Sequence, residues 1–143
     1  MGKPASYQLF VYGSLRQGFH HPAYQYIRQY FEFLGPARVK GLLYDMGDYP
    51  AALPTAEDRF IIGELYVLKN EDEFGWAMAQ LDDYEGVNPE AGQLALYRRD
   101  LAEVYAGSVV TGAWIYWYNS GVEGRPIIAS GDVLEYRQAK NHF

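Results

Sequence analysis

The chain of 143 residues carries a formal net charge of −6 and contains no cysteine. A chain of this length fits one domain that buries about 68–70% of its unfolded surface, so we expect a single domain over residues 1–143. The acidic balance argues against nucleic-acid binding, which depends on Lys and Arg placed against phosphates. The lack of cysteine excludes disulfides, thiolate catalysis and thiolate zinc sites.

The hydropathy pattern favours a cytoplasmic protein with no membrane partner. Residues 1–13 contain no apolar run of signal-peptide length, and no stretch approaches the ~20 apolar residues that a membrane span needs. Tyrosine occurs 14 times, which indicates a core or cavity lined by rings that carry hydroxyl groups. The sequence carries no signal for the oligomeric state.

The first half of the chain predicts strands around one short helix. Alternating or β-branched apolar residues predict strands over 7–12, 37–46 and 60–68. A helix is expected over 23–30, with Pro22 in its first turn and Tyr24, Ile27 and Tyr30 or Phe31 on its inner face. Gly41 is expected to form a bulge in the second strand, and the proline-bounded residues 47–54 are expected to be a loop.

The second half predicts one longer helix and a strand pair. A helix is expected over 71–86 with Asn70 as its N-cap, followed by a loop over 87–95, antiparallel strands over 96–106 and 111–119, and a helical turn near 132–137. The order of these elements predicts an α+β fold, a small curved mixed sheet or partial β-barrel flanked by two main helices.

Glu85 interrupts an apolar stripe on the predicted helix over 71–86. It continues the i, i+4, i+7, i+11 spacing set by three apolar residues, Phe74, Met78 and Leu81. A carboxylate directed at an apolar interior is unfavourable unless it is paired, neutralised or used chemically. The helix macrodipole also disfavours negative charge at a C-terminus, which would raise the pKa of this carboxyl group. Glu85 is therefore a candidate acid/base group.

Two simpler interpretations of Glu85 stay open at this point. Gly86 is expected to cap the helix in the left-handed conformation, and a carboxylate at a frayed helix end can turn out to solvent. The carboxylate can also be structurally paired. Arg98 and Arg99 point to opposite faces of a predicted strand, so one of them can counter a carboxylate such as Glu85. The aspartates at 82–83 are expected on other faces of the helix.

The bend after the first strand, residues 12–18, is a candidate binding loop. Gly13 allows a tight turn, and consecutive backbone N–H groups there can form an anion-binding nest. Gly13 and Gly18 have the spacing of a phosphate-binding loop. However, Phe19 and His20 stand where that loop needs Lys and Ser or Thr, so the motif does not predict a nucleotide site. A tight turn that binds nothing is the alternative.

Histidine does not indicate a metal site in this chain. His20 and His21 are adjacent, so their side chains tend to diverge, and the spacing of carboxylates does not complete a ligand set. We expect loop or helix-entry roles for both residues, and neither a metal nor another cofactor.

Four segments together resemble the γ-glutamylcyclotransferase-like family, which includes the γ-glutamylamine cyclotransferases and the plant avirulence-induced proteins. They are F-V-Y-G-S-L-R-x-G at 10–18, D-Y-P-A at 48–51, L-D-x-Y-E-G at 81–86 and Tyr97-Arg98, with a Gly-Asp pair at 131–132 in the tail. The resemblance implies a compact mixed fold with a cavity between the 12–15 loop and Glu85.

The resemblance also implies roles for individual residues. In such enzymes a glutamate accepts and donates the proton, and here it would be Glu85. The residues expected to bind the glutamyl moiety are Tyr12, Gly13, Ser14, Leu15 and Tyr97.

The expected activity is the conversion of a γ-glutamyl amine or γ-glutamyl amino acid to 5-oxoproline and a free amine, without a cofactor. One alternative is a non-catalytic member that binds a small acidic metabolite or a peptide end in the same pocket. A purely structural interaction protein is the third possibility. The leaving amine or amino acid stays open on the sequence alone.

Overall fold

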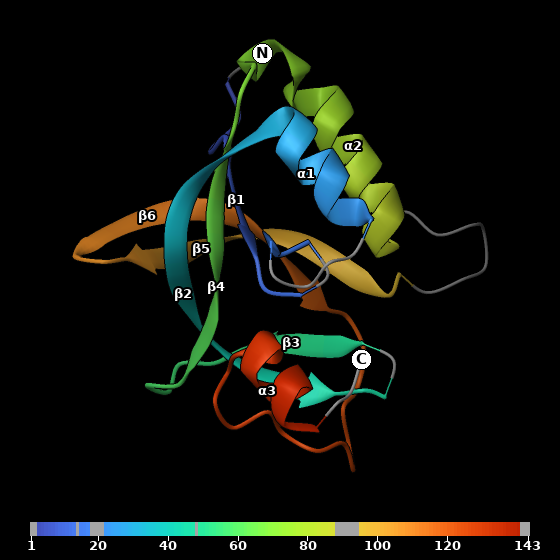
Figure 1. Cartoon of the computed structure of the whole chain (residues 1–143). Helices are drawn as coiled ribbons and strands as arrows, with labels where there is room; N and C mark the ends of the chain where they lie inside the picture. The colour runs from blue at the N-terminus through green and yellow to red at the C-terminus, as the bar shows by residue number, and fades with distance from the viewer. Residues whose placement is uncertain (1–2, 14, 18–21, 48, 88–94, 141–143) are drawn as a thin grey trace.

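Five β-strands close on one another to form a small barrel (Figure 1). The computed structural model describes residues 3–13, 15–17, 22–47, 49–87 and 95–140. Around the barrel lie β2 (Phe31–Asp45), β4 (Phe60–Leu68), β1 (Gln8–Val11), β6 (Val109–Tyr118) and β5 (Tyr97–Ala106). The barrel closes where Arg38 of β2 pairs with Tyr105 of β5. Because β1 is parallel to β6 while the other pairings are antiparallel, the predicted mixed, barrel-like sheet is confirmed.

Strand β2 is longer than the strand predicted over 37–46, because it begins at Phe31. Its Gly35-Pro36 pair does not end the strand. The chain absorbs the pair as a register shift between Phe33 and Gly35, where Gly35 takes a φ of 147°. The irregularity of β2 thus lies between Phe33 and Gly35, and the prediction of a bulge at Gly41 was wrong. Gly41 instead allows close packing, since a Cβ atom there would lie 2.5 Å from Cδ1 of Ile61.

The proline-bounded segment predicted as a loop over 47–54 contains a sixth strand, β3 (Pro50–Pro54). Strand β3 pairs only with the end of β2, at the edge of the sheet. Proline has no N–H group to donate to a neighbouring strand. It is tolerated at strand ends and on edge strands, because an edge strand has a hydrogen-bonded neighbour on one side only. The prediction of a loop at 50–54 was wrong, because proline interrupts a central strand but not the end of an edge strand.

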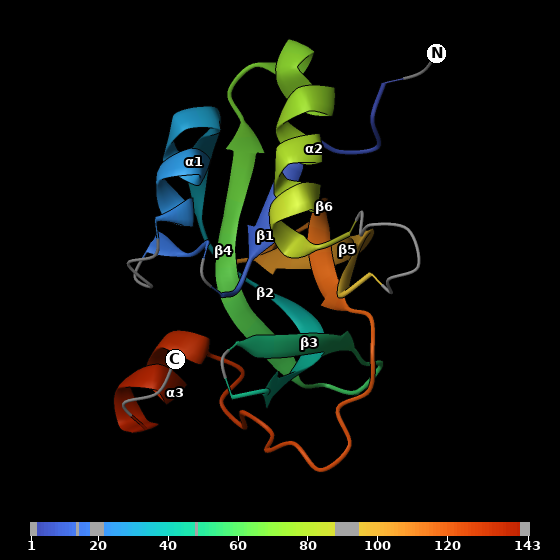
Figure 2. The same cartoon turned by 90° about the vertical axis from the view of Figure 1, so that its right-hand side faces the viewer.

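Helices α1 (Ala23–Tyr30) and α2 (Phe74–Glu85) lie side by side against the barrel, while α3 (Val133–Lys140) lies near β3, away from them (Figures 1 and 2). The bounds of α1 are those predicted. Helix α2 is preceded by the 3₁₀ turn η2 (Glu71–Glu73), where the Asn70 side chain accepts a hydrogen bond from the Asp72 N–H group, as expected of an N-cap. Within the described residues, no helix is long and apolar enough to cross a membrane.

Two apolar clusters fill the interior. Along β1, side chains alternate between them, because successive strand residues point to opposite faces. Leu9 and Val11 join the cluster that receives Ile27 of α1 and Met78 of α2. Phe10 joins the second cluster, with residues of the other barrel strands and of α3. This packing fixes α2, and hence its last residue, against the end of β1.

Candidate functional site

Glu85 is the last residue of α2, and Gly86 caps the helix in the left-handed conformation, with φ 77° and ψ 33°, as predicted. The apolar stripe that precedes it faces the core, where Met78 and Leu81 are buried. Glu85 itself keeps partial exposure and makes no hydrogen bond or ion pair with another residue that the structure describes. The protein around its carboxyl group is nevertheless dense enough that burial raises the pKa from 4.5 to about 7.

Asp82, one turn earlier, is the paired carboxylate of this helix. Arg99 donates two hydrogen bonds to it, from Nε at 2.7 Å and from Nη2 at 3.1 Å, and the hydroxyl of Tyr116 donates a third at 2.8 Å. One of the two arginines does counter a carboxylate of this helix, but that carboxylate is Asp82, which holds Arg99, and not Glu85. Arg98 pairs with Asp100. Asp82, expected on another face, is buried.

The neighbouring tyrosines place Glu85 close to the end of β1. The negative charge of Glu85 adds to burial in raising the pKa values of Tyr12, Tyr97 and Tyr116. Such an effect requires proximity. Tyr12 follows β1 and donates a hydrogen bond of 2.5 Å to the carbonyl of Tyr116. Glu85, Tyr12 and Tyr97, three of the predicted site residues, therefore share one region.

The bend after β1 completes this region. The carbonyl of Gly13 accepts a hydrogen bond of 2.9 Å from the N–H group of Arg16, which closes the turn. A Cβ atom on Gly13 would lie 3.4 Å from Cγ of Pro50, whose carbonyl accepts a 2.9 Å hydrogen bond from the Tyr97 hydroxyl. No hydrogen bond runs from the N–H groups of Gly13 or Leu15 to another described residue. These two groups can therefore donate to a ligand.

Three residues for which the sequence analysis predicted a role lie outside the described residues. They are Ser14, expected to bind the glutamyl moiety, and His20 and His21, expected in loop or helix-entry roles. Among the residues that the structure does describe, no three His, Asp or Glu side chains gather closely enough to hold a metal ion.

Sequence reasoning missed the role of Arg16, which is buried and anchors the bend. Its Nη1 atom donates to Oδ1 of Asp132 at 2.9 Å, and its Nε atom lies 3.6 Å from Oε2 of Glu64. The other carboxylate oxygen of Glu64 accepts hydrogen bonds from the N–H group of Gln17 and the hydroxyl of Tyr66. Arg16 and Asp132 both lie in segments that carry the family resemblance, but neither segment indicates that the two side chains meet.

We expect Asp132→Asn to lower the free energy of unfolding by about 1–2 kcal/mol, because a hydrogen bond between charged groups becomes one to a neutral amide. Asp132 also caps α3, accepting from the N–H groups of Leu134 and Glu135, and asparagine keeps that capping ability. Urea denaturation measures the loss. The control is Asp58→Asn, which removes an exposed pair with Lys40. Equal losses in the two variants would contradict the importance of the Arg16 contact.

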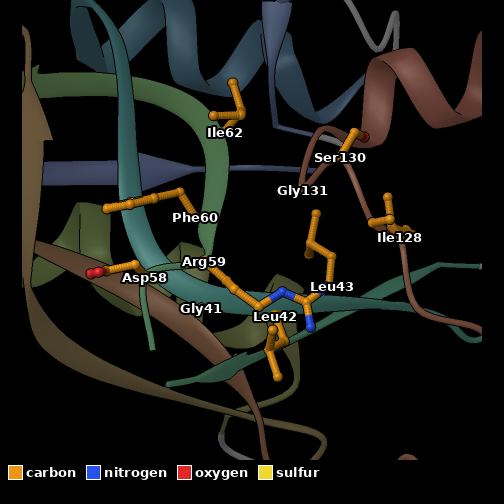
Figure 3. A pocket seen from close by; sticks show the side chains of 11 residues that line it. Gly41, Leu42, Leu43, Asp58, Arg59, Phe60, Ile62, Ile128, Ser130 and Gly131 are labelled. Carbon is orange, nitrogen blue, oxygen red and sulfur yellow. The ribbon is translucent and has the colours of Figure 1, made fainter. Parts of the chain in front are cut away.

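A separate hollow of about 270 Å³ lies among the backbone of β2, the start of β4 and the segment before α3 (Figure 3). The Arg59 side chain extends through it toward Leu42 and Leu43. None of the predicted site residues lines this hollow. It is therefore distinct from the region around Glu85.

The region around Glu85 combines the groups that proton-transfer chemistry needs. The Glu85 carboxyl group, which has no partner within the described ranges, has a pKa of about 7. It is therefore present in both protonation states near neutral pH and can accept and return a proton. Free backbone N–H groups of the bend can hold a carboxylate or a developing oxyanion.

Comparison with known proteins finds relatives of this chain in sequence and in fold. The family described as gamma-glutamyl cyclotransferase, AIG2-like, matches residues 9–137. The gamma-glutamylcyclotransferase family protein YtfP of Escherichia coli K12 is 31% identical over 129 residues, which are 90% of this chain and 96% of YtfP.

Solved structures agree with this relationship. The solution NMR structure of ytfP from Escherichia coli has a TM-score of 0.62 and 28% identity, over 90% of this chain and 97% of that one. An aig2-like protein from Mus musculus matches in fold, with a TM-score of 0.60 and 18% identity, over 82% of this chain and 80% of that one.

Proposed function

This chain belongs to the AIG2-like γ-glutamyl cyclotransferase family, and we propose that it is an active γ-glutamyl cyclotransferase with Glu85 as its general acid and base. Its substrate is a γ-glutamyl amine or γ-glutamyl amino acid, and its products are 5-oxoproline and the free amine or amino acid. The observation that carries this proposal is the contrast within α2. Asp82 is fully paired, whereas Glu85 has no hydrogen-bond or ionic partner among the described residues, is partly buried and has a pKa of about 7.

The reaction forms one bond and breaks one. The α-amine nitrogen of the substrate attacks its own γ-carbonyl carbon, which forms the five-membered ring. Glu85 in its carboxylate form takes the proton that the attacking nitrogen loses. It then gives this proton to the leaving nitrogen as the bond from the γ-carbon to that nitrogen breaks. The carboxyl group is thereby returned to its starting state, and no cofactor enters the balance.

The bend and the tyrosines position the substrate. The N–H groups of Gly13 and Leu15 donate to the α-carboxylate of the glutamyl moiety or to the oxyanion of the γ-carbonyl. We assign Ser14 to the same task from its place in the bend. Tyr12 and Tyr97 form the walls that hold the glutamyl chain folded, and holding the two reacting groups together supplies much of the rate gain of an intramolecular reaction.

The test is turnover. The protein is incubated with a panel of γ-glutamyl amines and γ-glutamyl amino acids, and 5-oxoproline is quantified by chromatography. We expect product from at least one compound, in proportion to enzyme concentration. If glutamyl compounds raise the melting temperature but no product forms between pH 6 and pH 9, the protein is a metabolite-binding member of the same fold and not an enzyme. The absence of both product and thermal shift would favour a structural interaction protein.

A further inference from the structure

A hollow of about 160 Å³ opens where the first turn of α1 meets the last turn of α2, two helices that lie side by side in both views of the molecule (Figures 1 and 2). Residues of both helices and of the bend after β1 line it: Leu15, Ala23, Tyr26, Gln80, Leu81 and Tyr84. The bend and the end of α2, which form the candidate site, therefore also line the hollow, together with α1.

The hollow lies beside the last turn of α2, the helix that ends at Glu85. Leu81 lies four residues before Glu85, on the same face of α2, and Tyr84 directly precedes it. Tyr84 also lies near enough to Tyr97 for its charge to contribute to the raised pKa of that phenol. Leu15 lies in the bend, and its N–H group makes no hydrogen bond to another described residue. A substrate held between the bend and Glu85 thus has the hollow as a neighbouring compartment.

Among the residues that the structure describes, the lining of the hollow carries no charged side chain. Leu15, Leu81 and Ala23 present aliphatic surface. Burial, together with the nearby Tyr30 and Glu73, raises the pKa of Tyr26 to about 12, so this phenol is neutral at physiological pH. Its hydroxyl is already used, since it donates a 2.8 Å hydrogen bond to the carbonyl of Ala77. A charged group placed here would lose water without gaining an ionic partner from the lining.

We propose that this hollow receives the leaving group of the substrate, and that this group is a neutral, apolar amine of about four to six carbon atoms. An apolar cavity of roughly 150 Å³ accepts a molecule of the size of benzene, so the volume matches such a group. The proposal rests on the proposed cyclotransferase function and adds its substrate class. Leaving groups with an ammonium or carboxylate at the far end are disfavoured, because the described lining offers them no counter-charge.

The experiment compares γ-glutamyl amides that differ only in the amine. The methylamide does not reach the hollow, the n-butylamide fills it, and the 4-aminobutylamide adds an ammonium group to the same chain. We expect kcat/KM for the butylamide to exceed the values for the other two by about tenfold or more, as pocket contacts of this size allow. Ala23→Leu, which adds volume at the hollow, should remove this advantage and leave turnover of the methylamide unchanged.

Ala79→Leu is the matched control, because Ala79 is an exposed residue of α2 outside the hollow. It should keep the wild-type preference. Equal kcat/KM values for the three amides, or loss of the preference in Ala79→Leu alone, overturn the subsite but leave the cyclotransferase function standing.

If the three amides are not turned over while another compound of the panel is, the proposed leaving group is wrong and the cyclotransferase function stands. If no compound of the panel is turned over, the proposed function fails. The hollow is then tested by titrating N-butylacetamide against the methyl NMR signals of Leu15 and Leu81. Shifts that Ala23→Leu abolishes support an apolar ligand site, and unchanged signals overturn that site as well.

Discussion

Glu85→Gln is expected to lower kcat for 5-oxoproline formation by about 10²–10⁴-fold, the usual contribution of a positioned general acid or base. Glutamine fills nearly the same volume but cannot accept the proton, so the loss reports on chemistry and leaves packing intact. The pH profile of the wild-type enzyme should rise through pH 7 as the carboxylate forms. Initial rates of product formation across pH 5–9 measure both effects.

The same substitution should change how stability depends on pH. The folded-state pKa of Glu85 is about 7, above its ordinary value of 4.5, so between these two pH values the folded chain keeps a proton that the unfolded chain has lost. The free energy of unfolding therefore falls as pH rises through this window and is level above it. A shift of this size is worth about 2–3 kcal/mol, allowing for the partial solvent access of the group.

Glu85→Gln lacks this ionisation, so it should be more stable than the wild type above pH 7 and similar to it near pH 4.5. The difference between the two unfolding curves isolates Glu85 from the other carboxylates. Asp83→Asn is the control, because Asp83 is an exposed carboxylate of the same helical turn. Full activity in Glu85→Gln, or a pH-independent difference in stability, would refute the assignment of Glu85.

Asp82→Ala is expected to lower the free energy of unfolding by about 3–5 kcal/mol, the cost of removing one partner from a buried ion pair. The side chains of Asp82 and Arg99 are only 11% and 21% exposed, so water cannot replace the lost partner in full. The Tyr116 hydroxyl also loses its acceptor. Urea denaturation monitored by circular dichroism measures the change.

Two further variants complete this test. Asp100→Asn removes the pair with Arg98, in which both side chains are far more exposed, and it should cost less than about 1 kcal/mol. The double variant Asp82→Leu/Arg99→Leu should be more stable than Asp82→Ala, because no unpaired charge then stays buried. Similar losses in the exposed and the buried variants would show that Asp82 is not a structural anchor.

The elements with strong local signals could be predicted from the sequence. Helix α1 follows from its apolar face and from Pro22 at its start, and the β5–β6 pair follows from alternation on both sides of a short turn. The approach of Glu85 to the bend after β1 followed from the helical stripe together with the family resemblance. In the first two cases residues near one another in the chain carry the information, whereas the third depends on the resemblance, which joins distant segments.

What could not be predicted depends on long-range register. Arg99 stands opposite Tyr116 in the β5–β6 ladder, and only this register brings both groups to Asp82. Periodicity alone gives no reason to prefer Asp82 over Glu85 as the partner of an arginine. The contact from Arg16 to Asp132 likewise joins the start of the chain to its end.

The position of β1 has a consequence for biosynthesis. This strand, which is followed directly by Tyr12, is made early, yet it lies between β4 and β6, and β6 begins only at Val109. In a nascent polypeptide that has emerged only as far as β4, the edge of β1 that pairs with β6 has no partner. Its unpaired N–H and C=O groups can then pair with another chain. Ribosome-bound fragments that stop short of residue 109 should consequently aggregate more readily than the finished protein.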